Sequence, residues 1–159
     1  MADPLIVSEL QTPASHGIDS ITRSYTNPGG APRGDSIADI EANTALMNQD
    51  DIAVYKASLM SDEFFTILTA EGLTDLAAGE RADYAAFIVP MLAGGNIKNP
   101  SSLLKDLVNA IFDGTGEDPA IRSNFEALIR ENKSVAEILE VRAKAGDVEQ
   151  AMLQLGWIV

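Results

Sequence analysis

The sequence predicts an all-α protein: a compact bundle of short helices with an extended N-terminal arm. Hydrophobic residues make up 46% of the 159 residues and aromatic residues only 6%. The core must therefore consist mainly of Ala, Leu, Ile and Val, a mixture that favours packed helices. Apolar residues recur at helical spacing along most of the chain, and turns of Gly, Pro, Asn and Asp separate these runs. We find no hairpin pattern and no internal repeat.

The first 34 residues are predicted to form a short helix and a connector, separate from a helical domain at residues 35–159. Asp3-Pro4 is typical of an N-cap followed by the first helical position, and predicts a helix over residues 4–11. Such a short helix is marginal in water on its own, so we expect it to dock onto another surface. Its apolar residues are Leu5, Ile6 and Leu10.

The connector from Thr12 to Gly34 contains four glycines and three prolines and no sustained apolar period. Helices and central strands are both disfavoured there. Over twenty residues without regular structure are unusual inside a compact domain, so we expect an arm that reaches a neighbour. The connector ends at Arg33-Gly34-Asp35, a cell-adhesion tripeptide. Because Gly34 and Asp35 also suit a hinge before a helix, we favour the hinge interpretation over adhesion.

From residue 35 on, the sequence predicts a series of short helices. Each begins near a capping residue or a proline and ends near a glycine or asparagine. The helix from Asp118-Pro119 is expected to run to about Asn132, and Ser134 with Glu137 forms a capping box for the next. Gly146 is expected to end that helix. The predicted helices begin near Asp35 or Ser36, Ile52, Ser61, Gly79, Asn99, Asp118, Ser134 and Asp147.

Acidic side chains outnumber basic ones 24 to 11, which gives a net charge of −13. This charge opposes binding to nucleic acid and to an anionic membrane, and would attract a basic protein surface. Cysteine is absent, which excludes disulfides, thiolate metal sites and cysteine nucleophiles. The start of the chain lacks the basic residues and long apolar run of a secretory signal, and no run is long enough to span a membrane. We expect a soluble protein that is not secreted by that route.

The sequence predicts no catalytic, cofactor-binding or metal-binding residues, and we do not expect an enzyme. The sole histidine, His16, lies in the connector, where no packed scaffold is predicted to fix it, so we expect an ordinary exposed histidine. Three pairs of carboxylates offer acid–base or cation chemistry, but all are predicted at helix starts or in loops, where capping explains them. They are Asp50-Asp51, Asp62-Glu63 and Glu117-Asp118.

Candidate partner-binding residues are found at both ends of the chain. The N-terminal ones are apolar residues of the short helix and polar or aromatic residues of the connector. Trp157, near the C-terminus, suits either a plug for the core or an anchor for a subunit contact. The candidates are Leu5, Ile6, Leu10, Tyr25, Arg33, Trp157, Ile158 and Val159.

A series of motifs covers about nine tenths of the chain. After Tyr25 come "IADIEAN", "MSDEFF", "LAAGERADY", "IKNPSSLLKDLVNAIFDGTG", "IRSNFEALIRENKSVAEILEV" and "GDVEQAM". In order and spacing, this series resembles a group of small uncharacterised helical proteins encoded among the structural genes of tailed bacteriophages. The chain departs from the group in its longer "NPGGAPRGDS" connector and its "GWIV" end.

The resemblance implies a virion component that is assembled in the cytoplasm of the host bacterium. Its partners would be other virion proteins, with several copies or a homo-oligomer in each particle, and it implies no catalytic residues. Its place would be the neck, the tail, the fibre-attachment region or the decoration of the head. The alternative is a soluble acidic inhibitor or chaperone that binds a basic protein. Dependence on salt separates the two, because a charge-driven complex weakens at moderate ionic strength and an apolar contact survives.

Overall fold

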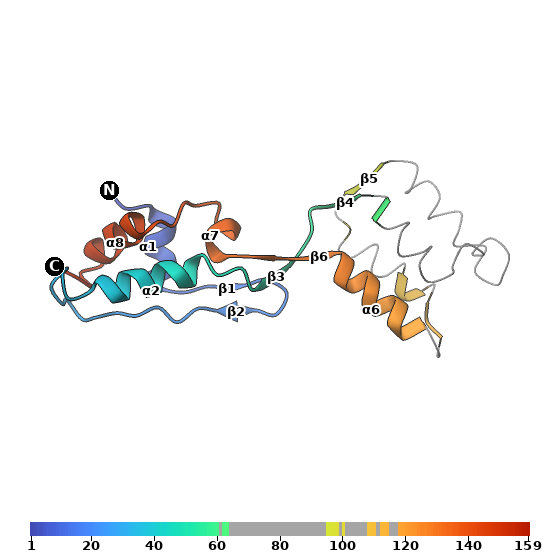
Figure 1. Cartoon of the computed structure of the whole chain (residues 1–159), viewed down its shortest axis with the longest axis horizontal. Helices are drawn as coiled ribbons and strands as arrows, with labels where there is room; N and C mark the ends of the chain where they lie inside the picture. The colour runs from blue at the N-terminus through green and yellow to red at the C-terminus, as the bar shows by residue number, and fades with distance from the viewer. Residues whose placement is uncertain (61, 64–94, 99, 101–107, 111, 115–117) are drawn as a thin grey trace. The chain divides into compact units, whose positions relative to one another are not determined.

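The computed structural model describes residues 1–60, 62–63, 95–98, 100, 108–110, 112–114 and 118–159. The chain forms two compact units: unit 1 is Met1–Val54 with Asn132–Val159, and unit 2 is Tyr55–Glu131. Unit 2 is therefore an insertion in the sequence of unit 1. The boundaries fall after Val54 and Glu131 rather than after Gly34, so the predicted arm belongs to unit 1. Both termini lie in unit 1 (Figure 1).

The described residues contain strands as well as helices, so the prediction of an all-α bundle was wrong: the protein is mixed α/β. The strands pair in three two-stranded sheets, β1 with β2, β3 with β6, and β4 with β5. The helices are α1 (Pro4–Gln11), α2 (Ile37–Met47), α6 (Asp118–Leu128), α7 (Val135–Ile138) and α8 (Ala145–Gln154). The strands are β1 (Ser15–His16), β2 (Ile21–Thr22), β3 (Ile52–Tyr55), β4 (Ser58–Met60), β5 (Asn96–Lys98) and β6 (Arg130–Lys133).

The strands escaped prediction because they are short and lack the alternation of a half-buried strand. β1 and β6 read Ser-His and Arg-Glu-Asn-Lys, and β6 pairs with a strand far away in the sequence. The predicted helix from Ile52 is in fact β3 and β4, and the helix expected to reach Asn132 ends at Leu128. The helices predicted within residues 64–94 and 101–107 lie outside the described residues.

The core of unit 1 joins the two ends of the chain. Both α1 and α2 pack against α8, and Figure 1 shows the three helices side by side. The N-terminal helix therefore buries its inner face in the same core as the C-terminal helix. The buried apolar residues are Ile6, Leu10, Ile40, Met47, Ile52, Val135, Ala136, Ala143, Val148, Ala151, Met152 and Ile158.

Helix starts follow their capping residues. Asp3 accepts a hydrogen bond from the Leu5 N–H at 2.9 Å, which confirms the predicted N-cap of α1. Ser134 and Glu137 form the predicted capping box of α7. Because α8 begins at Ala145, Gly146 lies in its first turn, and the prediction that Gly146 ends a helix was wrong.

The connector is folded onto unit 1 and is not a free arm. The fully buried Asn43 of α2 binds the backbone of Thr26 in both directions: its Oδ1 accepts from the Thr26 N–H at 2.7 Å, and its Nδ2 donates to the Thr26 carbonyl at 2.9 Å. An amide side chain thus replaces a strand as the partner of an extended backbone. The prediction of an extended N-terminal arm was wrong. It assumed that no other part of the chain would bind the backbone of the connector, because the sequence showed no strand to pair with it.

The C-terminal residues also hold the connector. Ala31 and Ile158 form a parallel bridge, in which the Gly30 N–H donates to the Trp157 carbonyl at 2.7 Å and the Val159 N–H to the Ala31 carbonyl at 3.1 Å. The "GGA" of the connector and the "WIV" of the C-terminus therefore form one structure at the end of unit 1.

Unit 2 has its own apolar contacts among its described residues. In the antiparallel pair β4–β5, Leu59 lies opposite Ile97. The rings of Phe112 and Phe125 stack with their centres 6.2 Å apart, and Arg122 of α6 donates to the Phe112 carbonyl. α6 therefore has its own apolar partners within unit 2.

Candidate functional site

A group of polar contacts inside unit 1 is centred on Glu9 of α1, which is only 3% exposed. Its Oε2 lies 3.1 Å from His16 Nε2 and accepts the Ala14 N–H at 3.3 Å, while its Oε1 accepts the Tyr25 hydroxyl at 3.2 Å. We call Glu9, Ala14, His16 and Tyr25 the Glu9 cluster. A buried carboxylate is costly unless hydrogen-bonded, and here three partners from the connector satisfy it.

The structure corrects the prediction that His16 is an exposed histidine without a scaffold. His16 is buried, pairs with Ile21 in the β1–β2 hairpin and contacts Glu9. The sequence did contain an indication of this cluster: Glu9 lies between Ile6 and Leu10 on the inner face of α1, a position where helical spacing expects an apolar residue. A carboxylate at such a position needs buried donors.

A second polar contact adjoins the cluster. The guanidinium of the buried Arg23 donates through Nη1 to Asp51 Oδ2 at 3.2 Å and through Nη2 to the Gln49 carbonyl at 3.1 Å, and it also bonds Asp51 Oδ1. The hydrogen bond from Arg23 lowers the pKa of the Asp51 carboxyl below its ordinary value. Arg23 therefore fixes the segment that leads into β3.

Burial and the neighbouring Glu9 carboxylate act together on Tyr25. Burial raises the pKa of the Tyr25 hydroxyl far above its ordinary value, and the negative charge of Glu9 raises it further because a phenolate beside it would be repelled. Tyr25 therefore stays protonated in the folded protein and donates its hydrogen to Glu9.

Replacing Tyr25 with Phe is expected to flatten the alkaline dependence of stability. A raised folded pKa stabilises the fold fully below the unfolded pKa of about 10, and this contribution is lost as the pH rises beyond it. The free energy of unfolding, from urea titrations at about pH 8 and about pH 11, should fall more steeply for the wild type than for Tyr25→Phe. Lysines are common to both proteins, so their titration cancels in the difference. An equally steep fall in both proteins would contradict the raised pKa of Tyr25 in the folded protein.

The Glu9 cluster is arranged to hold structure together. The acceptor oxygens of Glu9 are engaged by groups of the same chain, whereas a general base must reach a substrate. Across the residues that the structure describes, no three His, Asp or Glu side chains gather as a metal site. Asp50-Asp51 precedes β3 and not a helix, Asp118 begins α6, and Glu117 lies outside the described residues.

The predicted partner-binding residues fall into two groups in the structure. Ile6, Leu10 and Ile158 are buried in the core, while Tyr25 and Trp157 are half-buried and pack against it. For Trp157 this position agrees with the interpretation as a plug for the core. These five residues are largely covered within unit 1.

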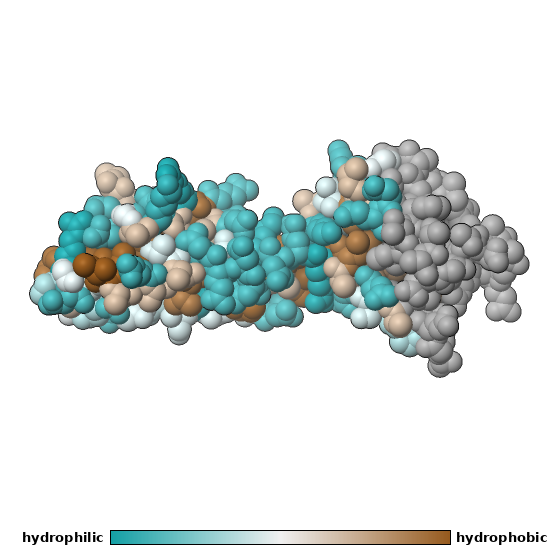
Figure 2. Space-filling model, viewed as in Figure 1, coloured by the Kyte–Doolittle hydropathy of each residue, from teal (hydrophilic) through white to brown (hydrophobic). Residues whose placement is uncertain are grey.

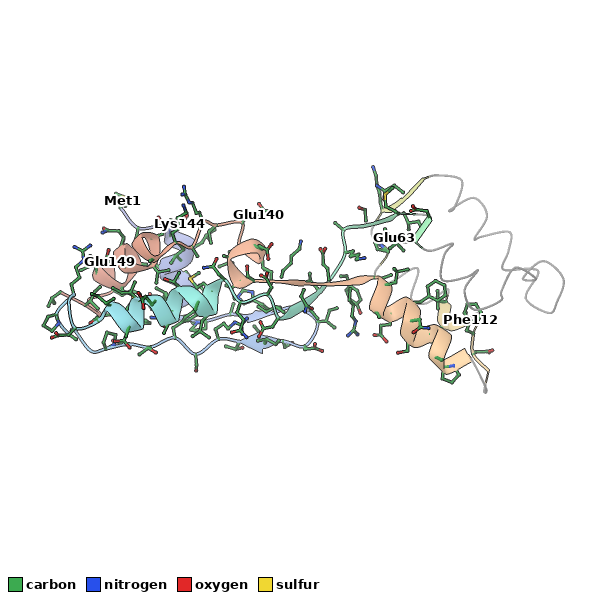
Figure 3. The ribbon with its side chains drawn as sticks, in the orientation of Figure 1. Met1, Glu63, Phe112, Glu140, Lys144 and Glu149 are labelled. Carbon is green, nitrogen blue, oxygen red and sulfur yellow. The ribbon has the colours of Figure 1, made fainter. Side chains whose placement is uncertain are left out.

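Leu5, Arg33 and Val159 are exposed, with 48% of Leu5 and 71% of Val159 accessible. The Arg33 guanidinium pairs with Glu149 of α8, which Figure 3 labels. Ile37, the first residue of α2, is also exposed, at 56%. Its apolar character alone could not reveal that.

Comparison with family models, with curated proteins and with solved structures found no match to this chain. Among the described helices, none is both long enough and apolar enough to cross a membrane. The indications of function are the motifs of the sequence and the surface of unit 1.

Proposed function

We propose that this protein is a structural, non-catalytic component of a tailed bacteriophage virion, and that it binds neighbouring virion proteins through the surface of unit 1. The motif series from Tyr25 to "GDVEQAM" supports the virion setting. The neck, the tail, the fibre-attachment region and the decoration of the head all fit such a role. The contact is made by a folded surface, since residues 1–34 are part of unit 1.

The observation that carries the proposal is a pair of exposed apolar residues at one end of unit 1. The Arg33 N–H donates to the Val159 carbonyl at 3.0 Å, and Ile37, four residues after Arg33 in the sequence, begins α2. We call Ile37 and Val159 the apolar edge. Figure 2 shows hydrophobic surface at the end of unit 1 where the C-terminus lies. Apolar groups that gather on a surface are typical of a protein contact.

Mass spectrometry of purified particles tests the proposal, and the chain should be present in every preparation. Replacing both residues of the apolar edge with Ser should lower the copy number per particle, because apolar area is lost from the contact. The matched control is Met60→Ser, which removes a comparably exposed apolar side chain from unit 2 and should leave the copy number unchanged. Particles that lack the wild-type chain would refute a virion role.

Charge favours the alternative, a soluble acidic inhibitor or chaperone that binds a basic protein. Unit 1 has twelve acidic and five basic residues, a net −7, and unit 2 has twelve and six, a net −6. Arg23, Arg33 and Arg130 are each paired with a carboxylate of the same chain, which leaves an acidic surplus on both units. A partner lost at moderate ionic strength would support this alternative, and a partner retained in high salt would support the apolar contact.

A further inference from the structure

We infer that the β1–β2 hairpin is a latch on the segment leading into β3, and that Glu9 positions this latch. The latch is residues 14–25, and the root of β3 is Gln49–Ala53. This inference concerns how unit 1 holds the strand through which the chain leaves it, and it stands independently of the proposed function. It rests on contacts made by the two sides of the hairpin.

The first side of the latch is held by α1. Glu9 contacts Ala14 and His16 at the start of the hairpin and Tyr25 just after it, so one carboxylate holds both ends of the segment. The hairpin itself has only two residue pairs, with one further bond between the hydroxyls of Ser15 and Thr22. Two-stranded hairpins are at best marginally stable alone, so the position of this one depends on its outside contacts.

The second side of the latch holds the root of β3. The Ile18 N–H donates to the Ala53 carbonyl at 2.8 Å. Gly17 lies so close to Ile52 and Ala53 that even a Cβ would have no room. On the returning strand of the hairpin, Arg23 bonds Asp51 and the Gln49 carbonyl. The root is thus held by the latch at both of its ends.

These contacts form one path from α1 to β3. Glu9 holds the hairpin in position, and the hairpin holds the root of β3 in position. The charged and titratable groups along the path are Glu9, His16, Tyr25, Arg23 and Asp51. Most of the links are hydrogen bonds, and they add to the apolar contacts that Ile52 of the root and Ile21 and Tyr25 of the latch make with the core of unit 1. A segment held in this way can open locally while the rest of the unit stays folded. Glu9 is therefore a positioning residue for the root of β3.

Amide hydrogen exchange on the full-length chain tests this inference. Glu9→Leu removes both acceptor oxygens but suits the apolar face between Ile6 and Leu10. We expect exchange at Ile18 and at the root of β3 to quicken by about tenfold or more, since bonds to a carboxylate are among the stronger ones. Exchange in α8 at Val148 to Met152 should change much less.

Glu9→Gln provides a milder variant in case Glu9→Leu does not fold. Its amide oxygen keeps part of the acceptor capacity, so Ile18 should exchange at a rate between those of the wild type and Glu9→Leu. Arg33→Gln is the control, because it breaks the exposed pair with Glu149, outside the latch. A uniform increase across the hairpin and α8, no increase at Ile18, or an equal increase with Arg33→Gln would each overturn the inference.

Discussion

Gly17→Ala should lower the free energy of unfolding of unit 1 by about 2–5 kcal/mol, from about 1–2 for the left-handed backbone and about 1–3 for overpacking. Gly17 has φ +75°, and a Cβ there would lie 2.4 Å from Ile52 Cγ2 and 2.6 Å from the Ala53 carbonyl oxygen. The root of β3 must move to relieve these contacts. Urea unfolding monitored by the fluorescence of Trp157, the only tryptophan, reports on unit 1.

Substitutions at two other connector glycines separate the backbone penalty from the overpacking penalty. Gly29→Ala meets the same backbone penalty at φ +71° but no atom within 4 Å, so it should cost about 1–2 kcal/mol. Gly34→Ala has an open surrounding and no positive φ, and should change stability by less than about 1 kcal/mol. If Gly17→Ala were no more harmful than Gly29→Ala, the hairpin tip would not be packed on β3.

Local chemistry explains what the sequence could predict. The start of α1 at Asp3-Pro4 and the capping box of Ser134 and Glu137 were found because cap and helix are neighbours in the chain. The same reasoning failed at Gly146, which lies in the first turn of α8 without a left-handed backbone. A glycine indicates where a helix can end, but packing decides whether it does.

Contacts between distant residues explain what the sequence could not predict. The connector has no apolar period, yet Asn43 binds Thr26, and Ile158 near the C-terminus forms a bridge with Ala31. Nothing in a stretch rich in Gly and Pro reveals that a side chain from another helix will satisfy its backbone. β6, with the sequence Arg-Glu-Asn-Lys, is a strand only because β3 lies beside it.

The candidate partner-binding residues show the same limit. Ile6, Leu10 and Ile158 were predicted as partner-binding residues at the two ends of the chain, but these ends pack together, and the three side chains are buried. Ile37 is as apolar as Ile40, three residues further along α2, yet Ile37 is exposed and Ile40 is buried. Apolar character predicts that a side chain will be buried, and the fold determines whether it is buried within the chain or against another protein.

Ile6→Ala should be among the most destabilising substitutions in unit 1, with a loss of about 2–5 kcal/mol, the range for truncating a buried Ile to Ala. Ile6 has no exposed surface, and α1 packs against α8, so the change leaves a cavity between the two ends of the chain. Urea unfolding monitored by Trp157 fluorescence gives the value, because both residues lie in unit 1.

Leu5→Ala is the matched control, one position away on the same helix. Because Leu5 is 48% exposed, its truncation should cost less than about 1 kcal/mol. The pair distinguishes an integrated N-terminal helix from a docking arm. An arm that ordered only against another protein would make both substitutions equally harmless to the isolated chain, whereas a helix inside the core makes Ile6 costly and Leu5 tolerant. Equal and small losses of stability would therefore contradict the packing of α1 in the core of unit 1. They would also contradict the contact by which Glu9 holds the hairpin.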